Sequence, residues 1–465
     1  MNTFTNNKNK YGEVFTPPSL IQQMIHDLKI CDGTILSLSQ MKYIFEPGAG
    51  KGVFFDVFVN QNKCFNKDNH FKYILNEINA EHLEDLQKVC KNHAKHAEIL
   101  LQDCLELDVK MECDLVVGNL PFNCHTKKFV PALAINHKDD KNVTQSKSVT
   151  LWTKITHFCF ERVLKTGGYF FAIIPCIWLK PDRSGIYDLF TRDHSIILLK
   201  TFDCKTANSL FDYNCQTPIC YVLVQKQKTK NSESEGESDG ESEGEGESES
   251  DVHRKQFKLY DHIKEKYIDF ELTPGKCIPT HFVEHFSNHS KYIEQNQISS
   301  CYHHVRKIST LNPACLSGEV KRFSKGGLED YLVDNETYKI ITGSVFDKKT
   351  NKLTLNGFVS SVPCLYYGKP KLILPHKRLA KFFKDYDGSY SCFGRDMYVF
   401  LCDSEKQIDE LYDFLNGNDN AVVNQMIESG FTIRMNFIEK YVFQYIPWIF
   451  DENFDYESYK EKCLC

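Results

Sequence analysis

The chain has 465 residues, 42% of them hydrophobic, and a formal net charge of −6. That length exceeds one ordinary hydrophobic core, so we expect two domains. No apolar run approaches the roughly 20 residues that span a bilayer, and residues 1–11 are polar rather than signal-like. We therefore expect a soluble, intracellular protein with no membrane partner, in the cytoplasm or, for a viral protein, in the nucleus or a viral factory.

The 19 cysteines are an odd number and form no Cys-x-x-Cys pair. This pattern argues against a zinc ribbon and against a disulfide framework. We expect reduced thiols, most of them buried, and no metal site.

Charge is unevenly distributed along the chain. Residues 232–251 alternate Ser, Glu, Gly and Asp and hold ten acidic residues and no basic one. Such a tract cannot build a core and is expected to be disordered. Residues 301–400, in contrast, carry 16 basic residues against 9 acidic ones, a distribution typical of a nucleic-acid-binding module.

Before the acidic tract, short apolar runs alternate with amphipathic stretches, which predicts βαβ units and a mostly parallel sheet covered on both faces. The last two strands are close in sequence and are expected to pair antiparallel. The expected strands are 43–45, 73–75, 99–101, 115–117, 169–174, 196–201 and 219–224, and the expected helices are 18–28, 52–60, 80–93, 150–163 and 187–190.

After the tract the pattern becomes one of short strands punctuated by Gly, Pro and Asn, which indicates an α+β domain. Expected here are strands at 338–341, 359–365, 372–374 and 397–401 and a helix at 404–415. The predicted organisation is a first domain over 1–230, a linker over 231–251 and a second domain over 252–465.

Four motifs follow four successive strands of the first domain. The Gly-rich stretch Glu46–Gly52 comes after the first strand, and glycines there let the backbone turn tightly and approach a ligand. Glu77 follows the second strand and could accept from ribose hydroxyls, and Asp103 follows the third and could accept from an adenine amino group. Because ligands of such sheets bind at the carboxyl ends of the strands, these motifs predict one nucleotide-like site.

The fourth motif, Asn119-Leu120-Pro121-Phe122, can grip an exocyclic amino group on a flat heterocycle. Asn119 offers a side-chain oxygen, and Leu120 offers a carbonyl that the following proline biases toward an extended conformation. Pro121 fixes the turn, and Phe122 offers a ring for stacking. A buried strand followed by an ordinary turn is the other interpretation of this segment alone.

Taken in this order, the motifs resemble the N6-adenine DNA methyltransferases of the γ arrangement, a group common in type II restriction–modification systems. The segment from Tyr11, with Phe15-Thr16-Pro17 at its centre, resembles their N-terminal cofactor motif, and Asn119–Phe122 resembles their catalytic motif with Leu120 in place of a proline. The resemblance covers about residues 10–226.

This resemblance implies a Rossmann-like domain with a mostly parallel seven-stranded sheet, S-adenosylmethionine as cofactor, and methyl transfer to N6 of a flipped-out adenine in duplex DNA. A C-terminal α+β domain would recognise the target sequence, and the enzyme would be a monomer. The implied catalytic residues are Asn119, Leu120, Pro121 and Phe122. The implied cofactor residues are Phe15, Thr16, Glu46, Gly48, Ala49, Gly50, Glu77, Ile78, Asp103, Cys104 and Asn119.

For the substrate, Phe122 and a second aromatic residue, Phe211 or Tyr213, are expected to face the flipped base. Arg378, Arg395 and Arg434 are expected to contact DNA. Asn-Leu-Pro-Phe is also the signature of rRNA adenine methyltransferases, although the Phe-Thr-Pro segment and the long C-terminal region resemble the DNA enzymes. An rRNA methyltransferase and a non-catalytic relative that binds the cofactor or nucleic acid therefore stay as alternatives.

Overall fold

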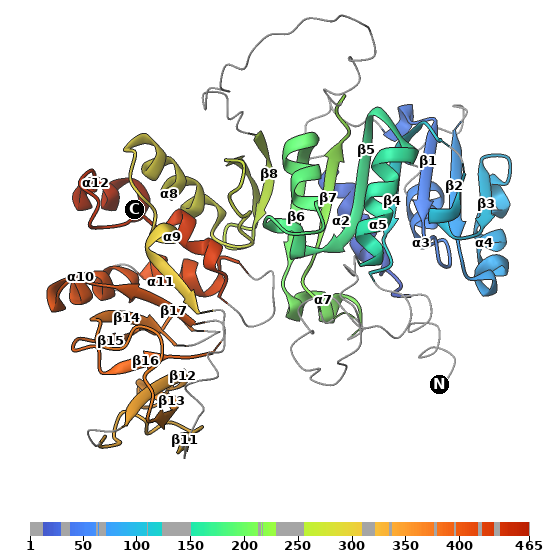
Figure 1. Cartoon of the computed structure of the whole chain (residues 1–465). Helices are drawn as coiled ribbons and strands as arrows, with labels where there is room; N and C mark the ends of the chain where they lie inside the picture. The colour runs from blue at the N-terminus through green and yellow to red at the C-terminus, as the bar shows by residue number, and fades with distance from the viewer. Residues whose placement is uncertain are drawn as a thin grey trace, which may run out of the picture. The chain divides into compact units, whose positions relative to one another are not determined.

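The computed structural model describes residues 13–28, 38–61, 64, 71–108, 110–122, 150–212, 215, 217–228, 255–308, 321–333, 337–375, 379–394, 397–416, 421–431 and 438–464. The chain divides into two compact units (Figure 1). Unit 1 comprises residues 1–260 and 266–276, and unit 2 comprises residues 261–265 and 277–465. The expected acidic linker, 231–251, lies outside the described residues.

Unit 1 is built on one nine-stranded sheet with the order β3-β2-β1-β4-β5-β7-β6-β8-β9. Strands β1 to β5 run parallel, and β7 pairs antiparallel with both β5 and β6, as expected for the last two strands of the sequence pattern. The strands are β1 (Tyr43–Pro47), β2 (Lys72–Glu77), β3 (Ala97–Leu101), β4 (Cys113–Asn119), β5 (Leu164–Pro175), β6 (Ser195–Phe202), β7 (Ile219–Gln225), β8 (Lys255–Asp261) and β9 (Lys266–Leu272).

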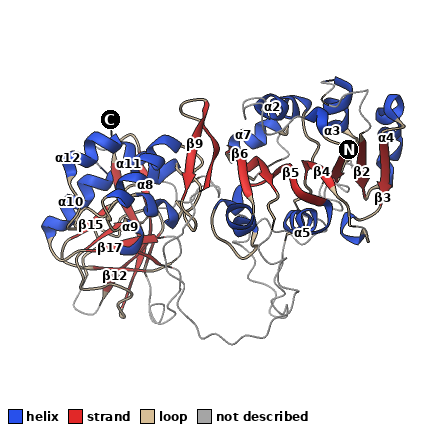
Figure 2. Cartoon of the chain, turned by 90° about the horizontal axis from the view of Figure 1, so that it is seen from above, coloured by secondary structure: helices blue, strands red, loops and turns tan. Residues whose placement is uncertain are grey.

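Helices cover both faces of this sheet (Figure 2). They are α2 (Pro18–Leu28), α3 (Val53–Phe55) with its π-helical continuation η2 (Asp56–Gln61), α4 (Leu83–Cys90), α5 (Leu151–Phe158) with η7 (Cys159–Val163), α6 (Ile186–Asp188) and α7 (Cys204–Leu210). Because the central strands are buried on both faces, they are almost continuously apolar, as β4 and β7 illustrate. The α/β methyltransferase fold expected from the sequence is confirmed.

The strand order reverses between β1 and β4, which lie side by side in the middle of the sheet. The described helices that come next in the chain after these strands, α3 after β1 and α5 after β4, lie on opposite faces of the sheet (Figure 2). At such a point the carboxyl ends of the strands form a crevice in which doubly wound sheets bind ligands. The Gly-rich turn follows β1 and the Asn119 motif ends β4. The fold therefore brings two stretches about seventy residues apart in sequence to one place.

Two of the sequence predictions need correction here. The sheet has nine strands rather than seven, because β8 pairs parallel with β6 through Leu198 and Leu199 and β9 follows it. Consequently the second domain does not begin at residue 252, since residues 255–260 and 266–276 belong to unit 1. The apolar side chains of β8 and β9, such as Phe257 and Phe270, are buried there.

Unit 2 holds two four-stranded sheets, ordered β10-β17-β14-β15 and β11-β13-β12-β16, with helices α8 to α12. The strands are β10 (Val305–Ile308), β11 (Arg322–Phe323), β12 (Tyr338–Asp347), β13 (Lys352–Ser360), β14 (Lys371–Leu374), β15 (Phe383–Asp385), β16 (Tyr390–Cys392) and β17 (Met397–Leu401). The helices are α8 (Val283–Gln295), α9 (Cys301–His304), α10 (Glu405–Asn416), α11 (Ala421–Ser429) and α12 (Tyr456–Tyr459).

The strand expected at 359–365 is wrong in its bounds, because β13 ends at Ser360. Pro363 lacks the N–H that a continued ladder needs, so the strand stops before it. The expected helix at 404–415 agrees with α10 within one residue. Among the described residues, no helix has the length and apolar character needed to cross a membrane.

Candidate active site

A cavity of about 740 Å³, its open mouth included, lies at the carboxyl ends of β1 and β4. Its walls come from three stretches that are distant in sequence, within 13–16, 46–54 and 119–122, together with Glu77 and Ile78. Most of the residues that the sequence predicted for cofactor binding and catalysis are thus gathered around one cavity.

The Gly-rich turn forms the floor of the cavity. Gly48 and Gly50 adopt left-handed φ angles of 72° and 55°, which side chains with a Cβ disfavour. A Cβ on Gly48 would lie 3.3 Å from Cδ of Pro121, and one on Gly50 would lie 3.5 Å from the ring of Phe15. The two glycines therefore let the Asn119–Phe122 segment and the N-terminal segment approach the turn closely.

Glu46 is a fully buried carboxyl at the start of this turn. The Tyr73 hydroxyl donates to its Oε2 at 2.8 Å. Burial raises the pKa of Glu46 to about 8; the Tyr73 hydrogen bond opposes this rise, and the nearby Glu77 carboxylate adds to it. A cavity lined by this carboxyl suits a cationic ligand, because a positive charge would favour the ionised form.

The raised pKa of Glu46 predicts a pH-dependent cost to folding. The unfolded chain loses this proton near the ordinary pKa of 4.5 and the folded protein only near 8, so the Glu46 contribution to stability falls as pH rises between these values. We expect Glu46→Gln to gain stability relative to wild type over this interval, by about 1 kcal/mol per pH unit. Urea unfolding of both proteins from pH 4 to 9 measures the difference. A difference that does not vary with pH would contradict the assignment.

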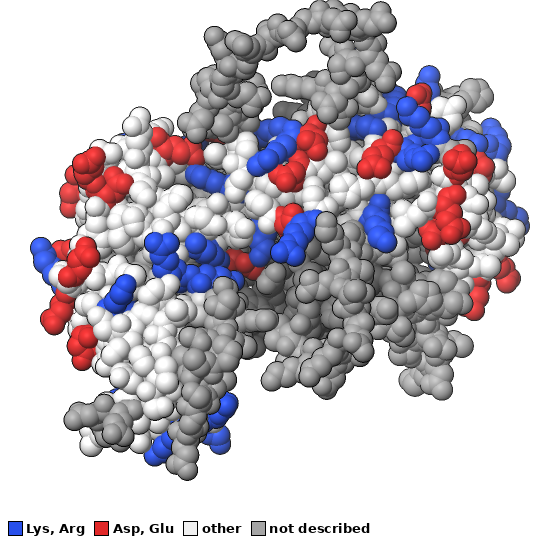
Figure 3. All heavy atoms as spheres, viewed as in Figure 1, with Lys and Arg blue, Asp and Glu red and all other residues white. Residues whose placement is uncertain are grey.

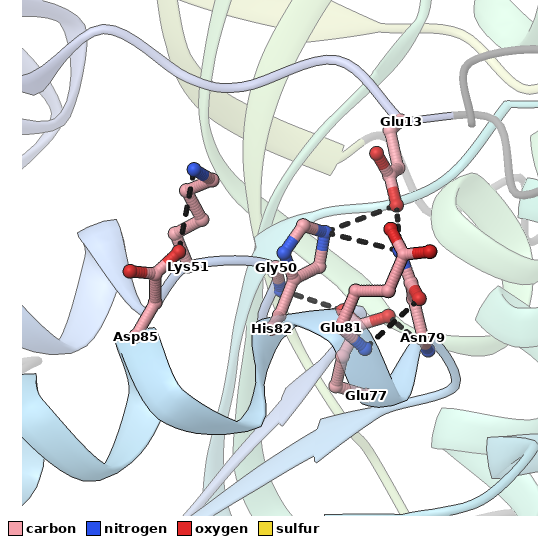
Figure 4. Close-up of polar contacts among 8 residues, drawn as sticks. All are labelled: Glu13, Gly50, Lys51, Glu77, Asn79, Glu81, His82 and Asp85. Atoms are coloured by element: carbon pink, nitrogen blue, oxygen red, sulfur yellow. Dashed lines mark hydrogen bonds and ion pairs between the residues drawn. The ribbon is translucent and has the colours of Figure 1, made fainter. Parts of the chain in front are cut away.

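Glu77 lies at the end of β2 and faces the same turn. Its Oε2 accepts from the Gly50 N–H at 2.6 Å, and its Oε1 accepts from the Asn79 N–H at 2.7 Å (Figure 4). A carboxylate has about four acceptor positions, so two stay available for ligand hydroxyls. Ile78, the next residue, is half exposed and also lines the cavity.

Asn119 ends β4 with its side chain at the cavity wall. Its Nδ2 donates to the Val14 carbonyl at 3.1 Å. Its Oδ1 is buried and has no hydrogen-bond partner among the described residues. A buried acceptor without a partner is costly, so a site that carries one is suited to a ligand that donates a hydrogen bond there.

The next three residues complete the wall. Leu120 is 1% exposed, and its N–H donates to the Ile173 carbonyl at 3.3 Å, which continues the pairing of β4 with β5. Pro121 packs against Gly48, and Phe122 is partly buried against the core of unit 1 while it lines the cavity. An amide oxygen, a buried main chain and an aromatic ring therefore lie in succession at one edge.

The N-terminal segment lines the cavity and is held by contacts that the sequence analysis did not predict, among Glu13, Asn79 and His82. Glu13 Oε1 accepts from Asn79 Nδ2 at 2.7 Å and lies 3.0 Å from His82 Nε2 (Figure 4). Phe15 and the buried Thr16, both predicted to bind the cofactor, follow in the chain and line the cavity. Of these three residues, only Glu13 could have been predicted from the sequence, because it lies within the motif that contains Phe15.

Three predicted residues lie elsewhere in unit 1. The Asp103 carboxylate accepts from the Leu105 N–H and caps the short turn η5 (Cys104–Glu106), and neither Asp103 nor Cys104 lines the cavity. Burial raises the pKa of the Cys104 thiol to about 12, so it stays protonated. Phe211 is 4% exposed in the core after α7 and not on the cavity. Tyr213, Arg378, Arg395 and Arg434 lie outside the described residues.

The residues present fit S-adenosylmethionine. The left-handed glycine turn admits a ligand close to the backbone, Glu77 retains acceptor positions for a ribose, and buried carboxyls suit a cation. In the described part of the chain, no group of three or more potential ligands could hold a metal ion.

Residues 1–165 match the family model described as N-6 DNA Methylase. No curated protein matches the chain.

Solved structures resemble the chain only weakly. They include a protein assigned to the class I S-adenosylmethionine-dependent methyltransferases from Listeria monocytogenes (15% identity, TM-score 0.34, 46% of this chain and 62% of that one). Two others are a modification subunit assigned to a type I restriction enzyme from Vibrio vulnificus (11%, 0.35, 57% and 51%) and a type I restriction–modification methyltransferase subunit from Streptococcus thermophilus (14%, 0.35, 55% and 50%). The chain thus spans about half to three fifths of the length of these structures. The segment that builds most of the cavity, residues 1–165, carries the sequence pattern of the N-6 DNA methylase family, whose cofactor is S-adenosylmethionine.

Proposed function

We propose that the protein is a site-specific DNA methyltransferase of the γ arrangement, which methylates N6 of a flipped-out adenine in duplex DNA. The observation that carries this proposal is the buried Asn119 Oδ1 without a partner among the described residues, on the wall of a cavity that also contains a nucleotide-type glycine turn. An adenine amino group has the donor that this acceptor lacks.

S-adenosylmethionine supplies the methyl group as an electrophile. Gly48, Ala49 and Gly50 would lie against it, Glu77 would accept from its ribose, and Phe15 and Thr16 would cover it. The carboxyl of Glu46 would face its cationic end and would ionise there, since a neighbouring positive charge lowers the pKa of an acid.

The chain's own part in the reaction is to hold the target nitrogen. The N6 lone pair of adenine is delocalised into the ring, so the amino group is a poor nucleophile. Asn119 Oδ1 and the Leu120 carbonyl would accept its two hydrogens and favour a pyramidal nitrogen with a localised lone pair. Phe122 would stack on the base, and catalysis would consist of positioning and fixed dipoles without an acid–base pair.

A base within a duplex cannot reach such a cavity, so the target adenine must leave the stack. The protein would act as a monomer. Its unit 2, over residues 277–465, would be the target-recognition domain and would bind the surrounding duplex. It carries Arg306 and Lys307 on the edge strand β10, and Lys440, whose Nζ lies 4.2 Å from the ring centroid of Tyr302. Arg306 and Lys307 lower the pKa of Lys440 by repulsion, although burial is the larger cause.

These three cations form what we call the β10 patch. Figure 3 shows Lys and Arg side chains gathered on the face of unit 2 around α9. Neither Arg306 nor Lys440 forms an ion pair with any described residue. Clustered cations beside an aromatic ring, two of them without an acidic partner among the described residues, suit a phosphate backbone.

We expect Arg306→Gln and Lys440→Gln each to weaken DNA binding about equally for all sequences. Each should reduce the slope of log affinity against log salt by about 1, because one phosphate contact is lost. Fluorescence anisotropy with duplex DNA at several salt concentrations measures the slope. Lys352→Gln, which removes an exposed charge on β13, is the matched control. Slopes equal to that of wild type in both patch variants would exclude the patch from the interface.

The alternative substrate is rRNA, because Asn-Leu-Pro-Phe, with Leu120 at its second position, is also the signature of rRNA adenine methyltransferases. Incubation with labelled S-adenosylmethionine and either duplex DNA or rRNA distinguishes the two. We expect label in N6-methyladenine of DNA only. Label found only in rRNA would overturn the proposed substrate, and undiminished transfer by Asn119→Ala would overturn the proposed site.

A further inference from the structure

The segment Glu13–Thr16, which we call the strap, connects the two functional sides of the cavity. At one end, Glu13 contacts Asn79 and His82, which follow β2 on the glycine-turn side. In its middle, the Val14 carbonyl accepts from the Asn119 amide at the end of β4. The strap therefore contacts both the glycine-turn side of the cavity and the Asn119 amide.

The Val14 carbonyl determines which way the Asn119 amide faces. With Nδ2 donating to this carbonyl at 3.1 Å, Oδ1 is left buried without a partner among the described residues. A flipped amide would set Oδ1 against the Val14 oxygen, so two acceptors would face each other. It would also offer N–H donors, rather than an acceptor, to the target amino group.

We infer that Glu13, Asn79 and His82 are positioning residues, which hold the strap so that the Val14 carbonyl keeps Asn119 Oδ1 directed at the target amino group. This inference rests on the proposed methyltransferase function and adds residues to its site. None of the three would touch the adenine itself.

The contacts at Glu13 are suited to this task because they are shielded from water. Its side chain is 14% exposed and that of His82 is 7% exposed, so their interaction is screened less than a surface pair. Asn79 adds rigidity, since its Oδ1 accepts from the Glu81 N–H and its own N–H donates to Glu77 (Figure 4). The strap is thereby joined to the carboxylate proposed to bind the ribose.

Phe15 provides a second contact between the strap and His82. Its ring meets the His82 ring edge-on, with centroids 5.8 Å apart, and Lys51 Nζ lies 5.6 Å from its centroid. Lys51 is itself paired with Asp85 at 3.2 Å on α4 (Figure 4). His82 thus holds the strap twice, through the Glu13 carboxylate and through the Phe15 ring.

The decisive variant is Glu13→Ala in the full-length protein. We expect the single-turnover rate of methyl transfer at saturating cofactor to fall about 10-fold or more, because small displacements of a positioned group are costly. Affinity for S-adenosylhomocysteine, measured by calorimetry, should also fall, since the strap lines the cavity. Glu13→Gln should lose less rate, because its Oε1 can still accept from Asn79. The thermal unfolding midpoints of both variants should match that of wild type.

Two controls make the test specific. Glu84→Ala removes an exposed acid two residues beyond His82 and should leave rate and affinity unchanged. In an Asn119→Ala background, Glu13→Ala should cause no further loss of rate, because its effect passes through Asn119.

A Glu13→Ala rate equal to that of wild type, or a loss that persists in full without Asn119, would overturn the inference. Failure of the proposed function is a separate outcome, because then wild type itself transfers no methyl group to adenine. In that case, an affinity of Glu13→Ala for S-adenosylhomocysteine equal to that of wild type would still contradict the role of Glu13 in holding the strap.

Discussion

Replacing Asn119 by alanine is expected to lower the rate of methyl transfer by about 100- to 1,000-fold, the usual cost of removing one preorganised polar group from a reacting centre. Affinity for the cofactor should fall less than the rate, because the glycine turn and the Glu13 contacts of the strap would stay intact. The loss should therefore appear mainly in the rate at saturating substrates, as expected for an interaction that matters most in the transition state.

Asn119→Asp separates the two functions of the amide. Aspartate keeps an acceptor for the target amino group but loses the Nδ2 donor, so a carboxylate oxygen would face the Val14 carbonyl. We expect this variant to be impaired nearly as much as alanine. Single-turnover assays of both, with Asn92→Ala on the exposed turn after α4 as a control, measure the effect. Full activity in the aspartate variant would show that the contact with Val14 is dispensable.

The sequence was sufficient for the parts of the site that depend on local pattern. A glycine turn after one apolar run and Asn119 at the end of another are features of a few neighbouring residues, and in a doubly wound sheet strand ends converge. That is why Glu46, Gly50, Glu77 and Asn119 were expected near one another, and the structure places them around one cavity.

The sequence was insufficient where the direction of a side chain depends on tertiary packing. Phe211 follows a short helix whose rotation about its axis decides between core and cavity, and the structure puts it in the core. Glu13 and His82 are 69 residues apart, and nothing in the local pattern of either predicts their contact. Strands β8 and β9 join the first sheet across the acidic tract, which composition alone marks as a boundary.

Unit 2 contains a buried ion pair that predicts a large effect on stability. Lys371 on β14 and Asp385 on β15 lie opposite each other in the antiparallel ladder, and their side chains are 0% and 1% exposed. Asp385 also accepts from the Ser389 N–H at 3.0 Å and the Tyr390 N–H at 3.2 Å, which shapes the turn into β16. The carboxylate thus joins three elements, and Lys371 supplies its countercharge.

We expect Lys371→Met to destabilise unit 2 by about 3–5 kcal/mol at pH 7, because an uncompensated carboxylate would stay buried. Burial already raises the pKa of Asp385 despite the attraction of Lys371. Without the lysine, this pKa should rise further, so the loss should shrink as the pH falls and the carboxyl takes up a proton. Urea unfolding at pH 5 and pH 7 measures both effects, with Lys352→Met as the exposed control.

The double variant Lys371→Met, Asp385→Asn should regain part of the lost stability, since the buried charge is then absent.

The ion pair is also linked to DNA binding, because β14 pairs with β17, and β17 pairs with β10, which contains Arg306 and Lys307. Lys371→Met should therefore weaken DNA binding at pH 7 while affinity for S-adenosylhomocysteine in unit 1 is retained. Equal losses of affinity for DNA and for S-adenosylhomocysteine would show that the two units do not bind their ligands independently. A Lys371→Met variant as stable as wild type would show that the ion pair contributes nothing to folding.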